Sequence, residues 1–192
     1  MLFSIDSGVP VLPCEEIETD KEKTICFTGH REINKKHLPY LNEVLRPIIA
    51  KLIEGGVTTF RAGGARGFDS FAAMNVVILK KQSYPDVTLH LCLPCPDQAD
   101  KWCEEDKSIY RQVLSECDSY TYAEPHYTRG CMHKRNRQLV DGADFCIAYY
   151  DGSSGGTAYT VDYAESHGVS VINIYPLLVE ASNPRIKFFW QK

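Results

Sequence analysis

The sequence predicts an α/β fold, built as a single three-layer domain with a mostly parallel sheet. Six short apolar segments alternate with longer segments of helical periodicity along the 192 residues, a length that fits one domain with a sizeable core. Most of these strands lack the apolar–polar alternation of a sheet with one face in water, so helices should cover both faces. Turns rich in glycine or arginine follow several strands, at the edge where open parallel sheets bind ligands.

The pattern divides the chain into strands, helices and two flanking segments. The predicted strands are residues 24–28, 58–62, 88–93, 119–123, 144–149 and 170–174. The first helix is predicted over 38–54. The second begins at about 69, the third ends at about 117, the fourth begins at about 131, and the fifth begins just after 157. Pro47 predicts a kink or a break in the first helix, because proline lacks the N–H of a helical hydrogen bond. We interpret 1–22 as an N-terminal arm, 23–180 as the domain and 181–192 as a C-terminal tail.

Composition narrows the class of protein. Hydrophobic residues make up 44% of the chain and charged residues 24%, which is ordinary for a globular domain. The formal net charge of −4 argues against a broad nucleic-acid surface, which normally has a basic excess. No apolar run reaches membrane-spanning length and no basic-then-apolar signal opens the chain, so we expect a cytoplasmic protein with no membrane partner. The eight cysteines are expected to be free thiols in a reducing compartment.

The segment 129–164 carries the sharpest signal for a binding site. A helix, a buried strand and a Gly155-Gly156-Thr157 turn follow one another, and the turn opens directly into a second helix. Such a turn presents free backbone N–H groups to a phosphate, and the helix N-terminus favours negative charge. Thr157 can cap the helix or bond the phosphate. Asp151, at the end of the strand, is a candidate for ribose binding or catalysis, or a turn-forming aspartate.

Arg135 is predicted to point inward. If Met132 is a core position, Arg135 and Asn136 share its face of the helix. An unpaired guanidinium is costly there, so it requires an anion. That anion is either an internal carboxylate or a ligand phosphate, and the neighbouring glycine turn favours the ligand.

The first strand ends in Gly29-His30-Arg31. The glycine allows a close approach of the backbone, and the imidazole and guanidinium can bind a phosphate or a base edge. The same three residues also suit a surface turn with solvated charges, and this segment alone does not decide between the two interpretations.

The second strand leads into G-G-x-x-G-x-D, which spans Gly63 to Asp69. This motif is neither the dinucleotide fingerprint nor a P-loop, so ATP hydrolysis of the P-loop type is unsupported. The backbone of Gly63, Gly64 and Gly67 can still hold a phosphate or ribose beside Arg66. Asp69 can accept hydrogen bonds from ribose hydroxyls, or simply favour the start of the next helix through its charge.

Two further patterns carry weaker signals. Cys92 and Cys95 form C-x-x-C, but Pro96 follows where a redox motif needs a helix N-terminus, so a redox role is disfavoured. No second pair of cysteine or histidine ligands appears at metal-binding spacing, so neither a metal nor a cofactor is expected. Four aromatic residues can stack on a base or belong to the core: Trp102, Tyr149, Tyr150 and Tyr159.

Taken together, these motifs resemble the SLOG superfamily, which unites the Lonely-guy hydrolases with the DNA-processing protein A domain. The chain is most similar to the YpsA-like branch, formerly a domain of unknown function. The resemblance covers about residues 23–174 and rests on T-G-H-R, G-G-A-R-G-F-D, L-P-C-P-D-Q-A-D-K-W, K-R-N-R-Q-L-V-D-G-A-D and Y-D-G-S-S-G-G-T, in that order. It implies a Rossmann-like fold that binds nucleotides or nucleotide-derived signals.

The resemblance also bears on catalysis. Lonely-guy hydrolases release a base with an arginine in a Met-His-x-Arg-Lys helix and a glutamate three residues after the threonine of their glycine turn. Arg135 matches the arginine, but Thr160 stands at the glutamate position, and the first carboxylate after it is Asp162. An oxocarbenium-like transition state needs a nearby carboxylate, so base release would depend on Asp151 or Asp69 instead.

The leading prediction is a sensor or sequestering protein for a nucleotide-derived molecule, such as NAD or an ADP-ribose-like compound, by family analogy. The second is a nucleotide N-glycosidase or phosphoribohydrolase with Asp151, Asp69 and Arg135 as catalytic residues. The third is single-stranded DNA binding, which the negative net charge of the chain disfavours. The resemblance further implies a homo-oligomer. The predicted ligand-binding residues are Gly29, His30, Arg31, Gly63, Gly64, Arg66, Gly67, Asp69, Arg135, Asn136, Asp151, Gly155, Gly156 and Thr157.

Overall fold

A computed structural model describes residues 23–183 and contains one six-stranded, all-parallel sheet in the order β4-β3-β2-β1-β5-β6. The strands are β1 (Lys23–Gly29), β2 (Val57–Ala62), β3 (Thr88–Leu93), β4 (Ser119–Tyr122), β5 (Phe145–Tyr149) and β6 (Ser170–Asn173). The helices are α1 (Leu38–Glu54), α2 (Phe68–Gln82), α3 (Glu104–Glu116), α4 (Cys131–Val140), α5 (Gly156–Ser166) and α6 (Tyr175–Ala181). The predicted α/β class and single Rossmann-like domain are confirmed.

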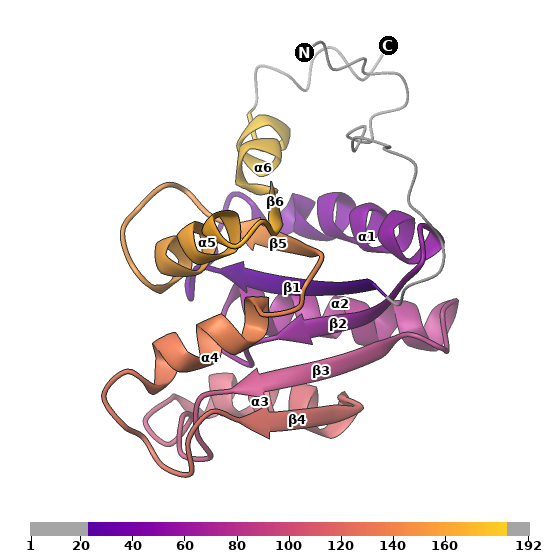
Figure 1. The fold of residues 1–192 in the computed structure, drawn as a ribbon. Helices are drawn as coiled ribbons and strands as arrows, with labels where there is room; N and C mark the ends of the chain where they lie inside the picture. Colours follow the sequence, from indigo (N-terminus) through magenta and orange to yellow (C-terminus); the bar gives the residue numbers. More distant parts are fainter. Residues whose placement is uncertain (1–22, 184–192) are drawn as a thin grey trace, which may run out of the picture.

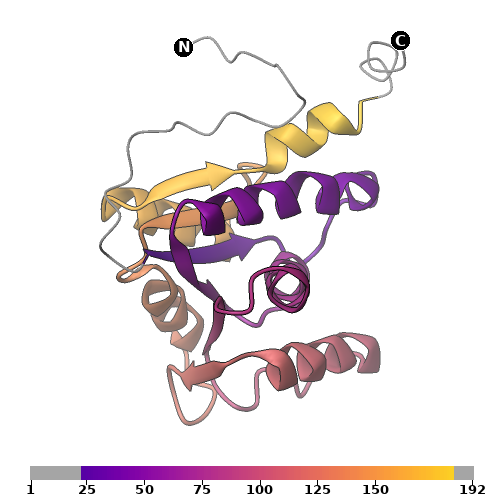
Figure 2. The same ribbon diagram turned by 90° about the vertical axis from the view of Figure 1, so that its right-hand side faces the viewer.

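Helices cover both faces of the sheet. Helices α1, α2 and α3 pack side by side on one face, and α4 and α5 lie together on the other (Figures 1 and 2). Helix α6 follows β6 and packs beside α1. The molecule therefore has three layers, with the apolar strands between them.

The order of the strands defines where the chain reverses its path. Strands β1 to β4 are added outward in one direction, and the chain then returns through α4 to place β5 on the other side of β1. Gly29 at the end of β1 is paired in register with Tyr149 at the end of β5. In open α/β sheets this reversal leaves a crevice beyond the carboxyl ends of the two strands, where ligands bind.

Aromatic packing fixes the strand ends beside that crevice. Phe27 of β1 stacks on Phe60 of β2 with ring centroids 5.8 Å apart, and Phe68 at the start of α2 stacks on Tyr149 at 5.5 Å. All four side chains are almost fully buried. Aromatic pairs of this geometry add to the stabilisation from apolar burial, so the loops after β1 and β2 leave from a rigid base.

The structure departs from the predicted elements in three places. Helix α1 continues through Pro47, so of the predicted kink or break the break does not occur, and the buried residues Leu45 and Ile48 on either side keep the helix packed on the core. Helix α6 was not predicted as an element. Strand β4 exposes all its residues, because it packs chiefly against β3 and no helix within residues 23–183 covers its faces closely. The predicted arm and most of the predicted tail lie outside the described residues.

Candidate functional site

Two adjoining cavities lie at the carboxyl edge of the sheet, around the ends of β1 and β5. The first, which we call the helix cavity, has a volume of about 380 Å³ and lies beside the N-terminus of α5. The second, the tyrosine cavity, has a volume of about 560 Å³ and is lined by Tyr149 and Tyr175. His30 and Arg31 line both cavities, so the loop after β1 forms the wall between them.

Most of the predicted ligand-binding residues line one cavity or the other. The helix cavity is lined by Gly29, His30, Arg31, Asp69, Arg135, Asn136, Gly156 and Thr157. The tyrosine cavity adds Arg66 and Asp151. Gly63, Gly64, Gly67 and Gly155 are not among the residues described as lining either cavity. The three candidate catalytic residues are thus divided, with Asp69 and Arg135 in one cavity and Asp151 in the other.

Arg135 meets an internal carboxylate, the partner that the sequence had left open beside a ligand. Its Nη1 donates to Oδ2 of Asp69 at 3.2 Å, and the two side chains are only 7% and 5% exposed. Burial raises the pKa of Asp69 above its ordinary value, although the charge of Arg135 opposes this rise. Burial therefore outweighs the ion pair at this carboxyl group.

The ion pair with Asp69 leaves one buried nitrogen of the Arg135 guanidinium unsatisfied. Its Nε is buried and has no hydrogen-bond partner among residues 23–183. A guanidinium carries five N–H donors, and an unpaired buried donor is costly. Arg135 thus retains hydrogen-bonding capacity on the wall of the helix cavity.

Three of the predicted cradle glycines have no room for a side chain: Gly63, Gly64 and Gly67. A Cβ at Gly63 would lie 1.5 Å from Nη1 of Arg135, and one at Gly67 would lie 2.4 Å from the carbonyl oxygen of Arg31. Gly67 also has φ +80°, a conformation that L side chains rarely adopt. These glycines hold the wall of the site together.

The first turn of α5 opens into the helix cavity. Gly155 is the N-cap, and no side chain caps the helix, so the predicted cap by Thr157 is not formed. The first backbone N–H groups of a helix lack intrahelical partners, and Gly156 and Thr157, at the start of α5, line the cavity. Asn136 of α4 donates from Nδ2 to the carbonyl oxygen of Gly156 at 3.3 Å, which ties the two helices together at the cavity.

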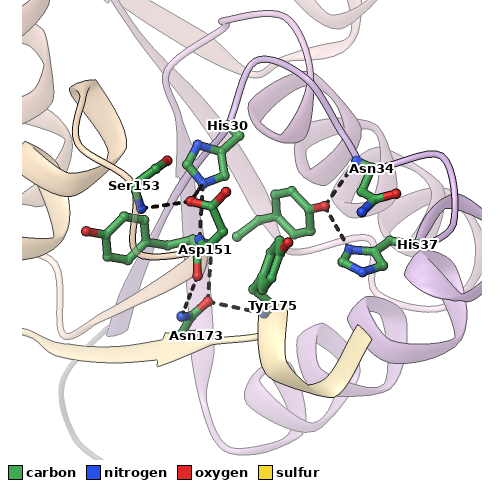
Figure 3. A network of polar contacts seen from close by, with 9 residues as sticks. His30, Asn34, His37, Asp151, Ser153, Asn173 and Tyr175 are labelled. Atoms are coloured by element: carbon green, nitrogen blue, oxygen red, sulfur yellow. Dashed lines mark hydrogen bonds and ion pairs between the residues drawn. The ribbon is translucent and has the colours of Figure 1, made fainter. Parts of the chain in front are cut away.

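His30 and Asp151 bridge β1 and β5 in the tyrosine cavity (Figure 3). Nε2 of His30 lies 2.8 Å from Oδ1 of Asp151 and 3.1 Å from its backbone nitrogen. The backbone N–H of Ser153 donates to the same carboxylate oxygen at 2.8 Å. Hydrogen bonds from Ser153, with a smaller contribution from His30, lower the pKa of Asp151. Asp151 is therefore ionised at neutral pH.

A polar network behind this pair involves residues that the sequence analysis missed. The Tyr149 hydroxyl accepts from the backbone N–H of Asn34 at 3.2 Å and lies 2.9 Å from Nδ1 of His37. Asn173 accepts from the backbone N–H groups of Tyr150 and Tyr175 at 3.2 and 3.1 Å (Figure 3). No local motif marks these partners, because the folding of distant segments brings them together.

Trp102, Tyr159 and Arg66 have structural partners. Trp102 packs edge-on against Tyr110, with ring centroids 5.6 Å apart, and the Tyr159 hydroxyl accepts from Arg137 at 2.9 Å. Arg66 pairs with Asp106 at 3.3 Å. Of the four predicted stacking aromatics, only Tyr149 is among the residues described as lining a cavity.

Three buried side chains bear on the possible chemistry. Burial raises the pKa of Cys92 to about 11 and of Cys95 to about 12, so both thiols are protonated near neutral pH. Thr160, at the position of the Lonely-guy glutamate, donates to the carbonyl oxygen of Gly156 at 2.8 Å. That position of α5 thus supplies a helix-bonded hydroxyl in place of a carboxylate.

Comparison with known proteins places this geometry in a family. The model of the YpsA family, described as the YspA SLOG family, matches residues 25–177. A UPF0398 protein of Bacillus pumilus is 26% identical over 156 residues, which cover 76% of this chain and 83% of that protein. Within residues 23–183, no helix is both long and apolar enough to cross a membrane.

Solved structures share the fold at low sequence identity. DNA processing protein A of Streptococcus pneumoniae has a TM-score of 0.52 and 15% identity, over 87% of this chain and 56% of that one. The Helicobacter pylori protein of the same name, described for its single-stranded DNA binding mode, has a TM-score of 0.55 and 16% identity. The match covers 87% of this chain and 78% of that one. With the family model matching most of its length, this chain belongs to the YpsA family of SLOG proteins.

Proposed function

We propose that this protein binds a nucleotide-derived ligand through a phosphate group in the helix cavity. The observation that carries the proposal is the buried Nε of Arg135, which has no partner among the described residues although it belongs to a side chain on the cavity wall. A phosphate oxygen is a strong acceptor for a guanidinium and would satisfy this donor.

The charges around the cavity favour an anion. The side chain of Arg31 is exposed, lines the cavity, and has no hydrogen bond or ion pair within the described part of the chain. The N-terminus of α5 adds backbone donors and a partial positive charge. Asp69 is the one carboxylate among the described lining residues, and a carboxylate oxygen can accept a hydrogen bond from a ribose hydroxyl.

Binding without turnover fits the site better than base release. The helix position that carries the glutamate in Lonely-guy hydrolases holds Thr160, and Asp69 is paired with Arg135. We therefore propose a sensor or sequestering role, with NAD or an ADP-ribose-like compound as the ligand suggested by the family resemblance.

A thermal-shift screen with AMP, NAD and ADP-ribose tests this proposal. Ligands that bind the native state raise the apparent stability, so at least one should raise the melting temperature. Arg31→Gln should weaken binding by roughly 10- to 100-fold, the loss of one charge-assisted hydrogen bond. Arg111→Gln is the matched control, since Arg111 is 64% exposed on α3 and should bind normally. No shift with any ligand, or equal shifts in both variants, would overturn the proposal.

The same samples distinguish the two alternatives. Chromatography after incubation should return the ligand unchanged, whereas released base that disappears in Asp69→Asn or Asp151→Asn would identify a hydrolase. The fold shared with DNA processing protein A makes single-stranded DNA the other alternative. A fluorescent oligonucleotide that binds with a steep salt dependence would favour DNA over a small ligand.

A further inference from the structure

The two cavities share one wall, and from this arrangement we propose that the ligand occupies both. It would be a two-part molecule in which two nucleoside-like or sugar groups are joined through phosphate, rather than a mononucleotide. This inference rests on the proposed function, because it assumes a phosphate in the helix cavity.

The shared wall is continuous and held at several points. Gly29 lines the helix cavity, Asn34 lines the tyrosine cavity, and His30 and Arg31 between them line both. The backbone N–H of His30 donates to the Tyr149 carbonyl at 3.3 Å, and the His30 carbonyl accepts from the N–H of Phe68 at 3.1 Å. A ligand that crosses this shared wall would therefore meet a preorganised backbone rather than a loop that must first be ordered.

Arg31 stands where the two parts would join. Its side chain is exposed, borders both cavities, and is neither hydrogen-bonded nor ion-paired within residues 23–183. The other cationic side chain of the tyrosine cavity, Arg66, is partly neutralised by Asp106. The unpaired guanidinium is thus best placed to bind a linking phosphate.

The chemistry of the tyrosine cavity suits a nucleoside-like group. The Asp151 carboxylate is held by Ser153 and His30 and lines this cavity, and a fixed carboxylate at the end of a parallel strand can accept hydrogen bonds from ribose hydroxyls. Tyr175 lines the same cavity (Figure 3) and packs against the buried Tyr149, with ring centroids 5.1 Å apart. The helix cavity, in contrast, has Arg135 and the start of α5 for phosphate.

The volumes of the two cavities agree with a ligand that has one part in each cavity. The helix cavity of about 380 Å³ and the tyrosine cavity of about 560 Å³ each reach the size of an ordinary small-molecule pocket. A mononucleotide anchored by its phosphate in the helix cavity would leave the larger cavity without a ligand group. A two-part ligand would use the donors and acceptors of both.

Calorimetric titration with AMP and with ADP-ribose tests the inference. The wild type should bind ADP-ribose at least roughly tenfold more tightly than AMP, since the second half adds about 1.4 kcal/mol or more. Arg66→Gln, at a residue that lines the tyrosine cavity but not the helix cavity, should weaken ADP-ribose binding and leave AMP binding unchanged. Asp151→Asn should also weaken ADP-ribose binding. Arg111→Gln should change neither, and Arg31→Gln should weaken both.

The outcomes separate this inference from the proposal beneath it. If neither compound binds, the proposed function is wrong and this inference fails with it. If both bind equally well, or if the tyrosine-cavity variants leave ADP-ribose binding intact, the nucleotide site stands and the two-part ligand is wrong. Weaker binding of AMP in Arg66→Gln would also contradict it, because AMP should occupy the helix cavity alone.

Discussion

At the scale of single residues, the Arg135–Asp69 pair marks the limit of what the sequence could predict. Helical periodicity placed Arg135 on the inner face of α4, and the structure agrees, with Arg135 only 6% exposed. Its partner lies on α2, 66 residues earlier in the chain, and no local pattern connects the two. The need for an anion was thus predictable from desolvation, but its identity depended on tertiary packing.

Arg135→Met should be strongly destabilising. The change leaves the Asp69 carboxylate buried without its partner, and breaking a buried pair in this way costs about 3–5 kcal/mol. Urea unfolding gives the free energy of unfolding directly. The double variant Asp69→Leu/Arg135→Met should lose less than the sum of the two single variants, because the two sites are coupled. A single variant within about 0.5 kcal/mol of wild type, the range of ordinary surface substitutions, would contradict the role given to this pair.

The pKa of Asp69 predicts a pH dependence of stability. In the unfolded chain this carboxyl titrates near 3.8, and in the folded protein its pKa is higher because of burial. Between those two values the folded state binds more protons, so the free energy of unfolding should fall as the pH rises through this window. Asp69→Asn should remove this contribution. The free energy of unfolding of the wild type minus that of the variant should therefore fall as the pH rises through this window, and a value that stays constant or rises would contradict the assignment.

At the scale of the elements, strands and helices with strong periodicity were predictable to within a residue or two. Strand β3 and helix α1 have the predicted bounds, because alternation, turn residues and apolar spacing agree locally. The continuity of α1 through Pro47 was not predictable, since packing on the core overrides the lost hydrogen bond. Helix α6 has only seven residues, too few for a clear periodic pattern.

The glycine turns serve two different purposes, and one pair of variants separates them. A Cβ at Gly156 would have only Asn136 within 4 Å, at 4.0 Å, whereas one at Gly63 would collide with Arg135. Gly156→Ala should therefore keep or slightly raise the free energy of unfolding, by up to about 1 kcal/mol, while weakening ligand binding in the helix cavity. Gly63→Ala should lower both stability and binding. Urea unfolding and calorimetry on the two variants check this, and normal ligand affinity in Gly156→Ala would contradict it.

At the scale of the whole molecule, the sequence predicted the edge of the sheet that carries the site but not its division into two cavities. Glycine and arginine turns at strand ends pointed to the carboxyl edge. The division follows from the pairing of β1 with β5, which sets Gly29 beside Tyr149, and sequence spacing gives no measure of that pairing. His30 and Asp151, similarly distant in sequence, meet for the same reason.

Self-association stays a prediction at this scale. The family resemblance implies a homo-oligomer, and the edge strand β4 leaves Tyr120 and Tyr122 49% and 37% exposed. Light scattering should give a mass that is a multiple of the 21.7 kDa of one chain. A mass of one chain across micromolar concentrations would contradict the prediction.

The most direct test of the central claim is a crystal structure of the protein with ADP-ribose bound. We predict that a phosphate oxygen lies within hydrogen-bonding distance of Arg31 and of the first backbone N–H groups of α5, with Arg135 Nε satisfied by the ligand or by water that the ligand holds. A ligand seated outside both cavities, or one whose phosphates make no contact with Arg31, Arg135 or α5, would contradict the account.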